Sequence, residues 1–230
     1  MACESTTTSN NTENTMTSKT YPTTGSIEVI DEALNQIIPA TAKIEVLAEG
    51  FTWSEGPVWV PALNSLLFSD VPENRIWRWS EEDSLQLYLE PSGYLGEREM
   101  REPGSNGLFI DNDGRLVMCQ HGERQVAYMD APLDAPQSKF VALAKTYNGK
   151  RFNSPNDLGI DRAGNVYFTD PAYGLPQQMN DPEKEIPFQG VYRRNTDGSV
   201  DLLVDSLTRP NGIEFTPDEK TLFVAVSDAK

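Results

Sequence analysis

From Lys43 onward, short apolar runs of about five residues alternate with Gly, Pro, Asn and Asp. Runs such as Leu66-Leu67-Phe68 and Val166-Tyr167-Phe168 have the aromatic or β-branched content that is typical of strands. Turn-forming residues, for example Arg162-Ala163-Gly164, separate these runs. No long stretch repeats its apolar positions at helical spacing. The pattern therefore predicts an all-β fold over residues 43–230.

One arrangement occurs four times in this part of the chain: a loop that delivers a polar residue, then a strand, a tight turn and a second strand. The clearest copy runs from Arg151 to Asp170. The polar residues at the equivalent position recur about every 50 residues, a period typical of repeat folds, and are Glu55, Asn106, Asn156 and Asn211. A further strand pair follows, as in residues 75–79 with 85–88. Four strands per unit predict a partial β-propeller of about four blades.

The four equivalent residues are candidates for a functional site. In a propeller the first strand of each blade lines the central channel, so these residues are expected to converge at one mouth of the channel. Asparagine has a low strand propensity, and its recurrence here favours a site. The alternative is that Asn-Gly and Asn-Asp simply form turns, which leaves Glu55 unexplained.

One carboxylate and three amide oxygens are ligands that a hard cation prefers. Calcium fits such a set best, and zinc, manganese and magnesium are alternatives. A cation at the mouth of the channel would polarise a carbonyl group and position a water molecule. The chemistry that follows is hydrolysis of an ester or a lactone.

The first 42 residues have a different pattern. Residues 1–24 are mainly Ser, Thr, Asn and Glu and predict a disordered leader. Residues 25–42 predict a short helical segment at the edge of the domain, from the spacing of Ile30, Leu34, Ile37 and Ile38.

The start Met1-Ala2-Cys3 resembles that of a mature bacterial lipoprotein. This interpretation predicts a lipid anchor at Cys3 and a location in the periplasm or cell envelope. The alternative is an ordinary polar tail on a cytoplasmic protein.

Composition excludes several classes of site. With 19 Lys and Arg against 35 Asp and Glu, the net charge is −16, which disfavours binding to nucleic acid. One histidine and two cysteines exclude a three-histidine zinc centre and a zinc finger. The sequence has no Gly-x-Ser-x-Gly motif. Nothing in it indicates an obligate protein partner.

Several spaced motifs resemble those of the gluconolactonase/regucalcin (senescence marker protein) family, closest to its bacterial gluconolactonase branch. The resemblance extends over about residues 43–230, and the motifs are residues 54–59, 120–124, 150–157, 167–175 and 209–213. It implies a six-bladed β-propeller with a divalent cation in the channel, calcium first, and hydrolysis of a sugar lactone such as gluconolactone.

The resemblance also implies roles for individual residues. Glu55 and Asn211 match metal ligands of the family. Asn156 matches an asparagine that binds the metal, or its water and the substrate, and is therefore also the catalytic candidate. Asn106 has no such match and is a substrate-binding candidate from the repeat alone.

Three further residues are substrate-binding candidates. Arg151 lies near the position of a substrate-contacting arginine of the family, although Ser154-Pro155 intervenes before Asn156. His121 and Tyr173 fall on loops expected to overlook the site, and the alternative for His121 is that it simply ends a strand.

The family's aspartate, which acts as the base or positions the water, is expected beyond Lys230. The sequence is therefore expected to lack roughly two blades of the family's propeller, and residues 1–230 alone are expected to have weak or no activity. Two alternatives stay open: a non-catalytic β-propeller that serves as a binding module, and a hydrolase of another lactone or a phosphoester.

Overall fold

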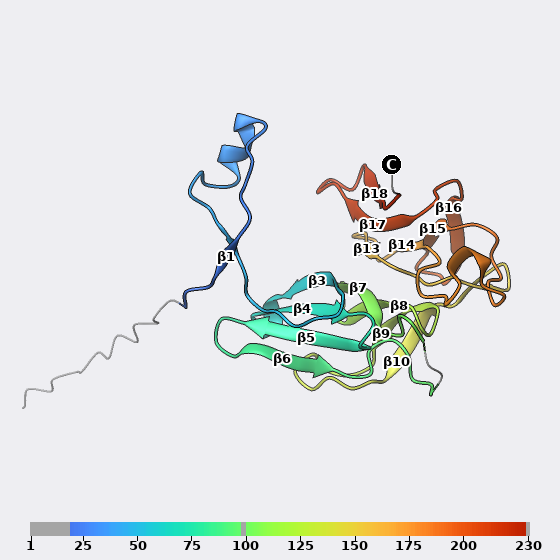
Figure 1. Ribbon diagram of the computed structural model, residues 1–230. Coiled ribbons are helices and arrows are strands. Elements are labelled where there is room, and N and C mark those ends of the chain that lie inside the picture. The colour runs from blue at the N-terminus through green and yellow to red at the C-terminus, as the bar shows by residue number, and fades with distance from the viewer. Residues whose placement is uncertain (1–18, 98–99, 229–230) are drawn as a thin grey trace, which may run out of the picture. The chain divides into compact units, whose positions relative to one another are not determined.

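The computed structural model describes residues 19–97 and 100–228 (Figure 1). The chain divides into two compact units, Met1–Glu49 and Gly50–Lys230. Cys3, the predicted lipid anchor, and most of the predicted leader lie outside the described residues. No helix among the described residues is long and apolar enough to cross a membrane.

The first unit contains one short strand pair and one helical turn. Strand β1 (Thr23–Thr24) pairs antiparallel with β2 (Ile44–Glu45), so the end of the predicted leader is a strand. Between them, η1 (Glu32–Gln36) is a 3-10 helix in the segment where a short helix is predicted. Asp31 caps it by accepting a hydrogen bond from the Ala33 backbone N–H. Pro39 prevents its extension because proline has no N–H and restricts the preceding residue.

The second unit consists of antiparallel sheets in which strand order follows chain order. The first sheet contains β3 (Ser54–Val60), β4 (Ser65–Asp70), β5 (Arg75–Ser80) and β6 (Ser84–Leu89). The second contains β7 (Ser105–Ile110), β8 (Leu116–Gln120), β9 (Gln125–Met129) and β10 (Phe140–Ala144). The third contains β13 (Leu158–Ile160), β14 (Val166–Asp170), β15 (Gly190–Arg194) and β16 (Val200–Val204).

Smaller elements complete the unit. A further two-stranded sheet is formed by β17 (Pro210–Phe215) and β18 (Leu222–Val226). A hairpin of β11 (Thr146–Tyr147) and β12 (Lys150–Arg151) precedes the third sheet. The 3-10 turns are η2 (Pro61–Leu63) and η3 (Gln178–Asn180). The prediction of an all-β fold is confirmed, and the six-bladed ring stays a prediction.

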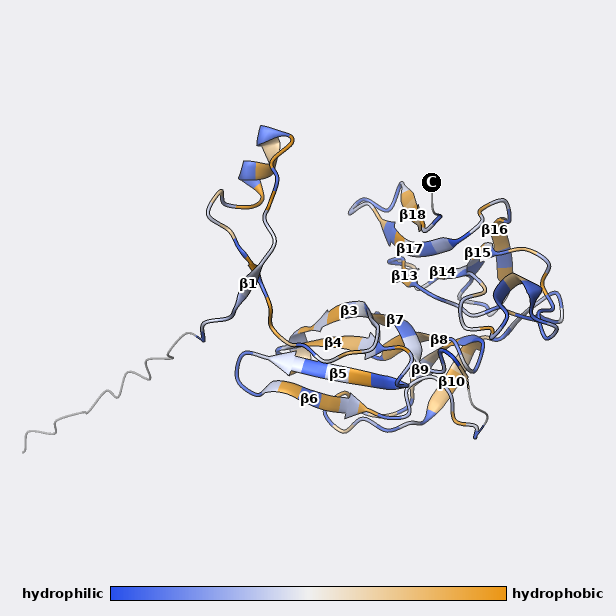
Figure 2. Cartoon of the chain, in the orientation of Figure 1, coloured by the Kyte–Doolittle hydropathy of each residue, from blue (hydrophilic) through white to orange (hydrophobic). Residues whose placement is uncertain are grey.

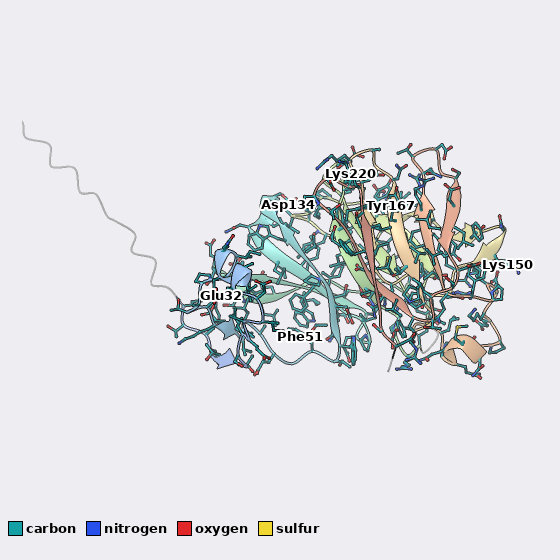
Figure 3. All side chains as sticks on the ribbon, turned by 90° about the horizontal axis from the view of Figure 1, so that it is seen from above. Glu32, Phe51, Asp134, Lys150, Tyr167 and Lys220 are labelled. Carbon is teal, nitrogen blue, oxygen red and sulfur yellow. The ribbon has the colours of Figure 1, made fainter. Side chains whose placement is uncertain are left out.

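The first strand of each sheet lies beside the first strand of the next. Strand β7 contacts both β3 and β13, and β13 also contacts β17. Aromatic side chains also join neighbouring sheets. Tyr167 of β14, labelled in Figure 3, packs edge-to-face against Phe215 of β17, with ring centroids 4.8 Å apart.

The hydrophobic core lies between the sheets, and β8 shows how the sequence builds it. Leu116 and Met118 belong to a cluster with first-sheet residues, whereas Val117 and Cys119 belong to a cluster with third-sheet residues. Successive side chains of a strand point to opposite faces, so a strand covered on both faces has an unbroken apolar run. Strand β5 instead mixes hydrophilic positions with a hydrophobic one (Figure 2).

Candidate functional site

The four residues at the repeated position come together in the structure. Glu55 lies on β3, Asn106 on β7 and Asn211 on β17, while Asn156 lies two residues before β13. All four line a cavity of about 370 Å³, which we call the mouth cavity. They also line a second cavity of about 390 Å³, which we call the channel cavity. The four residues therefore line two cavities where the first strands meet.

Three of these residues each lie at a β-bulge. The pairing of β3 with β4 shifts between Glu55 and Val58, and the first strand pair of the second sheet shifts between Ser105 and Leu108. The β17–β18 pair shifts between Pro210 and Ile213. Bulges re-aim side chains and are frequent beside active sites. Asn106 and Asn211 thus occupy bulges inside strands.

The loops before Glu55 and Asn156 are held by a buried carboxylate. Asp170, the last residue of β14, accepts hydrogen bonds of 2.8 Å from the backbone N–H groups of Asn153 and Ser154. Asp70, the last residue of β4, accepts equivalent bonds from Thr52 and Trp53. In each loop the second of these N–H groups lies two residues before Asn156 or Glu55. The carboxylate therefore fixes how that residue approaches the cavity.

Asn156 is buried and its side chain is only partly satisfied. Its backbone carbonyl accepts a hydrogen bond of 2.7 Å from Gly107, and its backbone N–H donates to Thr169. The side-chain Nδ2 lies 3.4 Å from Nε2 of His121. The Oδ1 atom is buried and has no hydrogen-bond partner among the described residues. A buried polar atom without a partner is costly, so Oδ1 is a candidate to bind a ligand in the cavity.

Glu55 is half-buried, and its Oε1 accepts a hydrogen bond of 2.8 Å from the indole N–H of Trp53. Asn211 is also half-buried, and its backbone carbonyl accepts a bond of 2.6 Å from the Thr169 hydroxyl. Their side chains border both cavities. No group of three or more His, Cys, Asp or Glu in residues 19–97 and 100–228 could hold a metal ion. A cation here would therefore depend on asparagine oxygens besides Glu55.

The remaining predicted residues separate in the structure. Tyr173 lines the mouth cavity together with the four residues of the repeated position. Arg151 is exposed and borders a different, smaller cavity of about 80 Å³. Its backbone N–H donates to Glu185 Oε2 at 2.7 Å. His121 is buried behind Asn106 and Asn156 and is not among the residues that line the mouth cavity.

Three residues of the site are not among the predicted site residues. Arg101 and Arg209 line the mouth cavity from loops. Asp157 borders the channel cavity and accepts hydrogen bonds from the backbone N–H groups of Leu158 and Ile213. Loss of hydration raises the pKa of Asp157 to about 6, and the charge of Glu55 adds to this, while the two N–H bonds oppose it. Its place directly after Asn156 was visible in the sequence, but its burial was not.

The successive antiparallel sheets and the oxygen donors gathered where their first strands meet are typical of the propeller class. Regucalcin from Agrobacterium tumefaciens has this fold, with a TM-score of 0.55 and 16% identity over 78% of this chain and 52% of that chain. The family profile described as SMP-30/Gluconolactonase/LRE-like region matches residues 53–230, so the chain belongs to this family.

Individual relatives agree with that assignment. A gluconolactonase of Zymomonas mobilis is 42% identical over 209 residues, which are 90% of this chain and 58% of the relative. A lactonohydrolase of Aspergillus oryzae is 32% identical over 76% of this chain and 41% of the relative. The structure of a gluconolactonase from Xanthomonas campestris has a TM-score of 0.72 and 36% identity, covering 86% of this chain and 62% of that one. The chain thus spans about half the length of the curated relatives it matches.

Proposed function

We propose that this protein is a metal-dependent lactonase that opens a sugar lactone such as gluconolactone. The observation that carries the proposal is the buried, unpartnered Oδ1 of Asn156, a residue that lines the same cavity as Glu55 and Asn211. The names of the Zymomonas and Xanthomonas relatives support the choice of substrate. The resemblance stated above supports a complete propeller of six blades around this site.

The donor set fits a hard cation. Glu55 would supply a carboxylate, and Asn156 and Asn211 would supply amide oxygens, which are normal ligands of calcium. When bound, such a cation polarises a carbonyl group and lowers the pKa of a water molecule. The Agrobacterium regucalcin is described as a calcium-binding protein, but at 16% identity it supports only the fold, so the choice of calcium follows from the donors.

The other residues of the mouth cavity would bind and orient the substrate. Asn106 and Tyr173 offer neutral hydrogen-bonding groups that suit the hydroxyls of a sugar lactone. Arg101 and Arg209 line the same cavity and would stabilise negative charge that develops on the lactone oxygen. We assign the base to no residue of this chain. Arg151 lies on another cavity and, within the proposal, does not reach the substrate directly.

The test is hydrolysis of glucono-1,5-lactone by the full-length gene product, corrected for spontaneous opening, during titration of the metal-free protein with calcium. We expect calcium to restore activity, and we expect Glu55→Gln to lower kcat/KM by at least about 100-fold because a metal-ligating charge is lost. Glu214→Gln is the matched control, since Glu214 lines only the channel cavity.

Equal activity of the Glu55→Gln protein and the wild type would refute the proposal. Absence of turnover, together with a melting temperature that calcium leaves unchanged, would favour a non-catalytic binding module. Turnover of a phosphoester or of a different lactone in preference to gluconolactone would keep the site but change the substrate.

A further inference from the structure

His121 lies behind the cavity wall and contacts two of its members at once. Its Nε2 is 3.3 Å from Nδ2 of Asn106 and 3.4 Å from Nδ2 of Asn156. The side chain is 1% exposed, and it is the only histidine of the sequence. One imidazole nitrogen therefore faces the amide groups of two residues that both line the mouth cavity.

The other ring nitrogen faces a carboxylate. Nδ1 of His121 lies 3.4 Å from Oε2 of Glu102 but makes no hydrogen bond among the described residues. The second oxygen of Glu102 is 3.4 Å from Nε of Arg101. An ionised carboxylate can only accept hydrogen bonds, so its field favours a proton on Nδ1. In the neutral ring this leaves a lone pair on Nε2, and the two asparagines must then present their NH₂ groups to it.

A side-chain amide is planar and carries its oxygen and nitrogen on the same carbon. An amide that turns its NH₂ group toward His121 consequently turns its oxygen away from the ring. This accounts for the Oδ1 atom of Asn156, which is buried and lacks a partner among the described residues. With the proton on Nε2 instead, the amide oxygens would be drawn to the ring, and the cavity would be lined by NH₂ groups.

We propose that His121 is a positioning residue that, as the Nδ1–H tautomer set by Glu102, aims the side-chain oxygens of Asn106 and Asn156 into the mouth cavity. It acts through the two asparagines and does not touch the substrate. The consequence for cation binding depends on the function proposed above, whereas the tautomer and the orientation of the amides do not.

Packing alone would make a different prediction. The Gly174 backbone lies so close that a Cβ atom there would be 2.9 Å from Cβ of His121, so the ring fills a tight space. If filling this space were its whole role, an aromatic ring of similar size would replace it without loss. Phe and Gln at position 121 separate the two roles. Only Gln has an acceptor atom at the same number of bonds from Cα as Nε2 of His121.

The first measurement is the tautomer of His121 by long-range ¹H–¹⁵N correlation in the wild-type chain with labelled histidine. Residues 1–230 are made without a histidine tag, so that all histidine signals in the spectrum come from His121. At about pH 8 we expect a protonated Nδ1 and an unprotonated Nε2. A proton on Nε2, in the neutral ring or the imidazolium, would overturn the proposal. Glu102→Gln is expected to raise the Nε2–H population, and an unchanged tautomer there would refute the role of Glu102.

The second measurement is the calcium affinity of the two variants by titration calorimetry, with thermal melts as a check on folding. We expect His121→Phe to weaken calcium binding by at least about tenfold and His121→Gln to stay within about threefold of the wild type. Equal affinity of the Phe variant and the wild type would overturn the proposal. If the wild type itself takes up no calcium, the proposed metal fails, and the tautomer still decides this inference.

Discussion

Asp170 combines a structural task with complete burial. Its two carboxylate oxygens hold the backbone of Asn153 and Ser154, and through them the entry to Asn156. Burial raises the pKa of Asp170 to about 7, while those two N–H bonds and the charges of Arg124 and Lys184 work in the opposite direction. The residue that fixes the site is therefore also a titrating group of the core.

Substitution of Asp170 by Asn should have an effect on stability that depends on pH. Between about pH 4 and pH 7 the unfolded chain loses the proton of Asp170 and the folded chain keeps it, so the wild type loses stability as the pH rises. Asn cannot titrate. The excess stability of the wild type over Asp170→Asn should therefore shrink across this range, on the order of 1 kcal/mol per pH unit. Urea denaturation of both proteins at the two ends of the range measures it, and a constant difference would contradict the prediction.

At the scale of elements, the strands approach one another closely at the bulges. Gly56 follows Glu55, with a φ of +56°, and a Cβ atom there would lie 2.2 Å from the backbone oxygen of Asn106. Gly107 follows Asn106, and a Cβ atom there would lie 2.7 Å from Cα of Asp157. The glycines after Glu55 and Asn106 thus let one first strand pack directly against the next. Glu-Gly and Asn-Gly in the repeat are a packing signal as much as a turn signal.

Gly56→Ala and Gly114→Ala form a matched pair that tests this packing. Both glycines have positive φ, but a Cβ atom at Gly114 meets nothing within 4 Å. Gly114→Ala should cost only the backbone strain, about 1 kcal/mol. Gly56→Ala must also displace a backbone carbonyl and should cost about 3 kcal/mol or more. Chemical denaturation gives both values, and equal losses would show that the sheets do not meet as tightly as described.

For the whole molecule, the period of the repeat was sufficient to predict the all-β class and the residues that meet at the cavity, because equivalent positions of successive sheets are neighbours in space. It could not predict Arg101 or Arg209, which reach the mouth cavity from loops without a repeated pattern. Nor could it place His121 behind the asparagines, since a strand-end histidine points toward or away from a site according to packing that no local pattern encodes.

The β17–β18 sheet gives the last prediction. Among the described residues β18 pairs only with β17, so its other edge presents unpaired backbone groups. Its side chains are apolar, and Phe223 is 62% exposed. An exposed apolar strand edge pairs readily with another copy, so residues 1–230 alone should self-associate.

A lysine at position 223 would place a charge on this edge, and Phe223→Lys should weaken the association by about tenfold. Leu95→Lys is the control, because Leu95 is 53% exposed but lies in a loop. Light scattering over a concentration series distinguishes them, and equal association of the two variants would place the contact elsewhere.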